Sequence, residues 1–131
     1  MKLQDRGGDI LFVASKNVPA PGKGAAAYSV AKAGQAQLAR VAALEAASKG
    51  IRVNVLHPHL ILDTAIWSDE VLEARAKAYG VTVDQYRRNN LLNTELSSED
   101  VAKAVFALVS GYFKKTTGAQ IAIDGGSDRT V

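Results

Sequence analysis

A tyrosine and a lysine stand four residues apart in the segment AYSVAKAG, residues 27–34. Residues at this spacing in a helix share one face, so Tyr28 and Lys32 can point into the same space. An ammonium beside a phenol favours the phenolate, and such a phenol can transfer a proton near neutral pH. An amphipathic tyrosine followed by a solvated lysine has the same spacing, so the pair taken alone favours an ordinary structural role.

Ser15 stands thirteen residues before Tyr28, at the end of a mostly apolar run over residues 9–15. The run predicts a strand buried on both faces. Ligands bind at the carboxyl ends of strands in open α/β sheets. A hydroxyl at that edge can hydrogen-bond a carbonyl oxygen while the tyrosine hydroxyl delivers or removes its proton. Ser15 taken alone is explained equally well as a cap of the following turn.

Strands and helices alternate along the chain and must hold these groups in place. Strand, helix and strand in succession predict a right-handed crossover between parallel strands, and hence an α/β layer fold. Residues 59–96 are mixed in pattern, with helical segments near 67–79 and 83–90, and are interpreted as an excursion from the sheet. The other elements are expected as strands over 9–15, 51–57 and 120–124 and helices over 26–49 and 101–109, the second helix begun by a capping box at Ser97 and Asp100.

Composition indicates one globular domain, because 131 residues with 47% hydrophobic content can bury a core. The net charge of +3 comes from scattered basic residues, so no nucleic-acid partner is expected. No apolar run reaches the roughly 18 to 20 residues that cross a membrane, and no signal peptide is evident, so we expect a cytoplasmic protein. The chain has no cysteine, and His57 and His59 lack a third ligand at a fitting spacing, so no metal site is predicted.

These motifs together resemble the short-chain dehydrogenase/reductase family. The resemblance rests on Ser15, Tyr28 with Lys32, the segment GIRVNV over 50–55, Pro58, and the closing TGAQIAIDGG over 117–126. It implies the C-terminal half of a Rossmann-type doubly wound parallel sheet, with about three strands and long helices. It also implies an oxidoreductase that transfers hydride between NAD or NADP and a small alcohol or aldehyde.

The resemblance implies a role for each site residue. Tyr28 would be the acid/base, Lys32 would favour its ionised form and hold the nicotinamide ribose hydroxyls, and Ser15 would orient the substrate oxygen. Pro58 and Thr64 would contact the cofactor together with the tyrosine and the lysine. The resemblance thus implies that residues up to 49 positions apart in the chain form one site.

Two departures from the family pattern bear on the cofactor. Family members usually have glycine after the proline, whereas this chain has His59, so the close backbone approach that glycine allows is in doubt. The family's glycine-rich fingerprint, its selector between NAD and NADP, and its relay asparagine all precede the serine strand, and only eight residues precede Asp9. We therefore expect residues 1–131 to form the C-terminal part of a dehydrogenase domain without its glycine-rich half, inactive alone and with NAD versus NADP open.

A narrower resemblance concerns the dehydrogenase part of bifunctional rhamnulose-1-phosphate aldolase/short-chain dehydrogenase proteins. It is carried by the segments ASKNVPAPGKG over 14–24, IWS at 66–68, AYG at 78–80, RRNNLL over 87–92 and KTTGAQ over 115–120. It implies a preceding aldolase domain and a small 2-hydroxyaldehyde substrate such as lactaldehyde. Residues 59–96 would then cover the substrate, with Trp67 and Tyr79 as candidate pocket walls, although packing of a lid against the sheet explains both aromatics equally well.

An alternative function of a different class is assembly. The helix expected over 26–49 is rich in alanine, and in the family this helix commonly builds a subunit interface. A homo-oligomer through this helix is therefore expected. A catalytically incomplete, dehydrogenase-like module that serves oligomer assembly remains the alternative to an enzyme.

Overall fold

A three-stranded parallel sheet forms the centre of the protein, in a computed structural model that describes residues 6–127. The strands are β1 (Gly8–Val13), β2 (Ile51–Pro58) and β3 (Gln120–Ile123), and they lie in the order β1-β2-β3. Gly8 of β1 pairs with Ile51 of β2, and Val55 of β2 pairs with Gln120 of β3. The fold class predicted from the sequence, a parallel α/β sheet of three strands, is confirmed.

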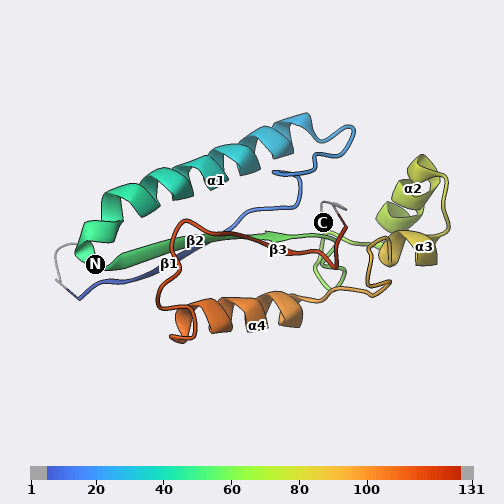
Figure 1. Cartoon of the computed structure of the whole chain (residues 1–131). Coiled ribbons are helices and arrows are strands. Elements are labelled where there is room, and N and C mark those ends of the chain that lie inside the picture. The colour runs from blue at the N-terminus through green and yellow to red at the C-terminus, as the bar shows by residue number, and fades with distance from the viewer. Residues whose placement is uncertain (1–5, 128–131) are drawn as a thin grey trace.

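Two helices sandwich the sheet. Helix α1 (Ala26–Ala46), extended by the 3₁₀ turn η1 (Ala47–Lys49), covers one face, and α4 (Ser98–Val109) covers the other (Figure 1). A further pair, α2 (Asp69–Tyr79) and α3 (Val83–Arg87), lies beyond the end of the sheet at which β2 ends (Figure 1). The carboxyl ends of the strands therefore face α2 and α3, which is the edge that ligands use in this class of fold.

The main core lies between α1 and the central strand. Four alanines of α1 recur every three or four residues on one face and are buried: Ala36, Ala39, Ala43 and Ala46. They pack against Val53 and Val55, which are 0% and 1% exposed, and against Ile51. Small side chains at helical spacing let the helix approach the sheet closely, while the branched side chains of β2 fill the space between them.

Two polar residues of β2 hold the sheet to the segment between α4 and β3. The Arg52 guanidinium donates to the carbonyl oxygens of Leu108 at 2.8 Å and Phe113 at 2.7 Å. The buried Asn54 donates to the Thr116 carbonyl at 3.1 Å and accepts from the amide of Ala119 at 3.0 Å. These bonds satisfy carbonyls at the end of α4 and the chain that leads into β3, so these two residues of the GIRVNV motif serve the fold.

The excursion over 59–96 folds on itself. The Ser68 hydroxyl caps α2 and the Thr82 hydroxyl caps α3, the latter within a capping box. Leu72 and Tyr86 are buried in a small core of their own, together with Leu60 and Ala76. One isolated bridge, between Ile61 and Leu96, joins the two ends of the excursion. The segment is thus a helical unit attached at the carboxyl end of the sheet.

Element boundaries differ from the predictions by a few residues. The first strand ends at Val13, two residues before Ser15, although the amides of Ala14 and Lys16 still donate to carbonyls of β2. The capping box at Ser97 and Asp100 is present, with the helix running over Ser98–Val109. The helix expected over 83–90 ends at Arg87. Among residues 6–127, no helix is both long and apolar enough to cross a membrane.

Candidate active site

A cavity of about 670 Å³ opens at the carboxyl end of the sheet, between the β1–α1 connection and the excursion. All six residues that the sequence analysis assigned to the site contribute to its wall, namely Ser15, Tyr28, Lys32, Pro58, Thr64 and Trp67. They come from four separate segments of the chain, so the fold brings together groups that the sequence keeps apart. The three groups of the expected catalytic set share one cavity.

Ser15 is held by hydrogen bonds to its backbone and its side chain. It is only 9% exposed. Its carbonyl accepts from the amide of Val18 at 3.0 Å, which closes the turn after β1. Its hydroxyl oxygen accepts from the amide of Asn17 at 3.2 Å. Because that bond uses a lone pair of the oxygen, the hydroxyl proton stays available for an acceptor in the cavity. The Ser15 hydroxyl can therefore cap the turn after β1 and still donate to a substrate in the cavity.

Tyr28 and Lys32 lie one turn apart at the start of α1. The lysine Nζ is 5.9 Å from the centroid of the tyrosine ring, over its face. The same ammonium donates to the carbonyl of Val13 at 3.0 Å and to Oε1 of Gln35 at 3.2 Å. Since the Val13 carbonyl belongs to the end of β1, the lysine is tied to the sheet as well as to its own helix. The tyrosine is 50% exposed and open to the cavity.

The other three residues line the cavity from β2 and the excursion. Pro58 is the last residue of β2. The Thr64 hydroxyl donates to the carbonyl of Ile61 at 2.8 Å, so its proton is used within the excursion. The Trp67 ring lies 6.4 Å from the ring of Tyr86, and the Tyr79 ring lies 5.7 Å from the same ring. The aromatic residues therefore pack on one another and also form the cavity wall.

His59 lies on the cavity wall, although the sequence analysis considered it only as a departure from glycine and as a metal ligand without enough partners. Burial, aided by the nearby Lys16 ammonium and opposed by the Asp124 carboxylate, lowers the pKa of His59 to about 4. The imidazole is therefore neutral at pH 7. The backbone of Leu60, the next residue, has φ +48°, a conformation that side chains other than glycine rarely adopt.

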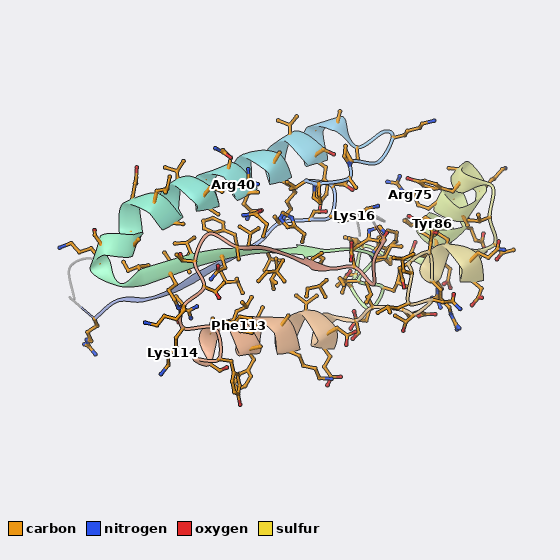
Figure 2. All side chains as sticks on the ribbon, in the orientation of Figure 1. Lys16, Arg40, Arg75, Tyr86, Phe113 and Lys114 are labelled. Carbon is orange, nitrogen blue, oxygen red and sulfur yellow. The ribbon has the colours of Figure 1, made fainter. Side chains whose placement is uncertain are left out.

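Charged residues of the cavity wall are all cationic. The lining residues include Lys23, Lys32 and Arg75, and none of the lining residues is a carboxylate. Figure 2 shows Arg75 on the side of α2 nearer to Lys16. No sequence signal pointed to Arg75, because its place depends on where the excursion packs. The resulting positive potential disfavours cationic substrates.

Comparisons with known proteins show to which family the chain belongs. A family model described as Enoyl-(Acyl carrier protein) reductase matches residues 1–128. A protein of Bacillus subtilis named "Uncharacterized oxidoreductase YuxG" is 44% identical over 96% of this chain, which covers 19% of that protein. The 2,3-dihydro-2,3-dihydroxybenzoate dehydrogenase of Escherichia coli is 31% identical over 95% of this chain and 50% of that protein. The chain belongs to the short-chain dehydrogenase/reductase family.

Solved structures of other short-chain dehydrogenases agree with this assignment. Sorbitol-6-phosphate 2-dehydrogenase from Erwinia amylovora superposes with a TM-score of 0.86 at 26% identity, over 97% of this chain and 51% of that chain. A short-chain dehydrogenase family protein from Francisella tularensis superposes with a TM-score of 0.79 at 28% identity, over 95% of this chain and 52% of that chain. This chain thus spans about half the length of these relatives, and it belongs to a family of oxidoreductases.

Short-chain dehydrogenases generally use NAD or NADP. The hydrogen bonds of Lys32 indicate whether its ammonium can also bind the ribose next to the nicotinamide. A lysine ammonium has three N–H donors. Two of them bond Val13 and Gln35, and the third has no acceptor among residues 6–127. A lysine that is fixed by two bonds, lines a cavity and keeps one free donor fits a ribose hydroxyl. The residues described here contain no group of three or more histidine or acidic side chains that could hold a metal ion.

Proposed function

We propose that this chain carries the proton-transfer site of an NAD(P)-dependent oxidoreductase that interconverts a small alcohol and its aldehyde. The observation that supports the proposal most is the common cavity of Ser15, Tyr28 and Lys32 at the carboxyl end of the sheet. A phenol, an ammonium and a hydroxyl converging on one space form an acid/base with an oxygen-binding donor.

Each side chain has one task in the proposed reaction. The Ser15 hydroxyl donates to the substrate oxygen, since its own oxygen already accepts from the amide of Asn17. The Tyr28 oxygen takes the hydroxyl proton when the alcohol is oxidised and returns it when the aldehyde is reduced. Lys32 places its positive charge over the ring of Tyr28 and donates its third N–H to a ribose hydroxyl. NAD(P), when bound, would supply or accept the hydride at the substrate carbon, and Pro58 and Thr64 would contact it from the cavity wall.

The excursion over 59–96 is proposed to cover the substrate. It carries the aromatic part of the cavity wall, including Trp67, and it attaches to the sheet edge where the strands end. A neutral His59 beside these aromatics adds a polar group without adding charge. The cavity therefore suits a small hydroxy-carbonyl compound without a positive charge, because its cationic wall disfavours cations.

The specific substrate proposed is lactaldehyde, in a longer protein in which an aldolase domain precedes the dehydrogenase. Support comes from the sequence segments that resemble the bifunctional aldolase/dehydrogenase proteins. It also comes from the length of the Bacillus relative, of which this chain covers only 19%. Either NAD or NADP is compatible with the residues described, because the expected selector lies outside them. The 131-residue chain alone is expected to be inactive and to bind the cofactor weakly.

One experiment tests the reaction class and the substrate together. The full-length protein is assayed by nicotinamide absorbance with NAD or NADP in both directions, using lactaldehyde and unsubstituted small alcohols and aldehydes. The proposal predicts turnover, with lactaldehyde the preferred aldehyde, and a kcat about 100-fold lower in Ser15→Ala, as expected when one oxygen-binding donor is lost. Turnover that is unchanged in Ser15→Ala would contradict the proposed site.

A homo-oligomer through α1 is proposed as the state in which the enzyme works. The side of α1 away from the sheet exposes Val30, Leu38 and Leu44, at 73%, 59% and 83%. Exposed apolar side chains on one helix face are typical of an interface. A module that serves assembly alone is not favoured, since it gives no reason for a cavity that Ser15, Tyr28 and Lys32 line together.

A further inference from the structure

A buried histidine connects the β1–α1 turn to the far strand of the sheet. His57 of β2 is 4% exposed, and its two ring nitrogens contact different segments. Nδ1 lies 2.8 Å from the carbonyl oxygen of Ser15, and Nε2 lies 2.8 Å from the side-chain amide of Gln120 at the start of β3. One side chain therefore links the serine of the candidate site to both β2 and β3.

The direction of the first bond follows from its acceptor. A carbonyl oxygen only accepts, so His57 carries a proton on Nδ1 and donates it to the Ser15 carbonyl. Nε2 is then the acceptor nitrogen and requires a donor. The Gln120 amide nitrogen is buried without a partner when its oxygen faces the ring. With the amide turned over, N–H faces Nε2, so that Gln120 donates to His57 and His57 donates to Ser15.

The neighbouring backbone shows how the ladder between β1 and β2 ends beside Ser15. Ala14 donates to the carbonyl of Leu56, and Lys16 donates to the carbonyl of Pro58. Between these two bonds the regular parallel ladder would have the amide of residue 58 donate to the carbonyl of Ala14, but Pro58 has no N–H. The imidazole of His57 instead donates to the next carbonyl along the chain, that of Ser15.

We propose that His57, fixed by Gln120, is a positioning residue that holds Ser15 in register for the substrate oxygen. The His57 bond fixes the peptide plane that follows Ser15, and the Asn17 bond fixes the hydroxyl oxygen itself. The orientation of the serine hydroxyl then depends on both. The inference rests on the proposed function, because it acts only through the role of Ser15 in that reaction.

Two isosteric substitutions separate the two bonds of the imidazole. The amide nitrogen of Asn in His57→Asn lies near the position of Nδ1, so it keeps the donor to Ser15. The amide of Gln in His57→Gln reaches the position of Nε2, so it keeps the contact with Gln120 and loses the bond to Ser15. We expect a kcat 10- to 100-fold lower in His57→Gln, the scale of a small misplacement in an active site, with KM changed less than threefold. His57→Asn keeps the donor to Ser15 but loses the contact with Gln120, so it should lower kcat only three- to tenfold.

A double variant shows whether the effect passes through the serine. In Ser15→Ala the hydroxyl is absent, so adding His57→Gln should lower kcat by less than twofold further. Full additivity of the two losses would overturn the proposal, as would a kcat of His57→Gln within threefold of wild type. Thermal midpoints of all variants are measured beside the kinetics, so that a loss of folded protein is recognised.

Gln120→Met provides a second route if His57→Gln does not fold. It preserves the side-chain length at residue 120, removes the donor to the imidazole, and leaves His57 in place. A kcat three- to tenfold lower is expected, and an unchanged kcat contradicts the proposal. Failure of the proposed function is recognised separately, because Ser15→Ala alone would then leave kcat unchanged.

Discussion

The stability of the protein should fall between pH 7 and pH 5 because of one histidine. Burial and the Lys16 charge hold the pKa of His59 at about 4, against 6.5 for the unperturbed group. Near pH 5 the unfolded chain therefore binds a proton at this site that the folded protein does not bind. Since protons then favour the unfolded state, stability is complete above pH 6.5 and declines as the pH falls toward 4.

The size of this effect follows from the two pKa values. Integrating proton uptake from pH 7 to pH 5, with one pKa at 6.5 and the other at about 4, gives a loss of about 2 kcal/mol in the free energy of unfolding. Contact of His59 with solvent at the cavity wall makes this an upper value. The substitution His59→Asn removes the titrating group but keeps a polar side chain of similar reach.

Urea unfolding of the full-length wild type and His59→Asn at pH 7 and pH 5 measures the effect. Any packing change in the variant contributes at both pH values, so only the difference between the two pH dependences is used. We expect the wild type to lose more than the variant between pH 7 and pH 5, by up to about 2 kcal/mol. Equal losses in both proteins would refute the account of His59 as a buried, neutral imidazole.

Three further perturbations test the fold and the assembly. Asn54→Ala should lower the free energy of unfolding by about 2 kcal/mol in urea titrations, because it leaves the part-buried amide of Ala119, just before β3, without its acceptor. A loss below about 0.5 kcal/mol would contradict that role. Gly125→Ala should speed proteolysis within the excursion, since Gly125 has φ +64° and an added Cβ would lie 2.6 Å from a side chain of the 90–94 loop; an unchanged cleavage rate contradicts the close packing. Leu44→Lys should lower the mass measured by light scattering, whereas Phe106→Lys on α4 should not; equal masses of Leu44→Lys and wild type count against the α1 interface.

The sequence was sufficient to predict that Ser15, Tyr28 and Lys32 lie at one edge of the sheet, where they line one cavity. Helical spacing places the tyrosine and the lysine on one face, and the strand-end rule places the serine at the same edge of the sheet. Both arguments use local sequence patterns, whose structural meaning does not depend on how the helices and strands pack together. The same locality explains why α1 and the capping box of α4 were predicted nearly residue by residue.

Contacts between distant segments could not be predicted in the same way. Asn54 bonds the chain 62 residues later, and the ring of His57 reaches Gln120, 63 residues later. A strand pattern shows that such residues are in a strand but not which partner lies opposite. The lowered pKa of His59 depends first on its burial and then on the nearby Lys16 ammonium, and no spacing in the sequence encodes either.

The central claim is that Tyr28 is the acid/base of the reaction. The direct test is kcat of Tyr28→Phe in the full-length enzyme, with Tyr112→Phe as the matched control, since Tyr112 is 83% exposed on the turn after α4. Loss of a general acid/base predicts a kcat lower by about 10²- to 10⁴-fold in Tyr28→Phe, with a thermal midpoint equal to that of the control. A Tyr28→Phe enzyme as active as Tyr112→Phe would contradict the account.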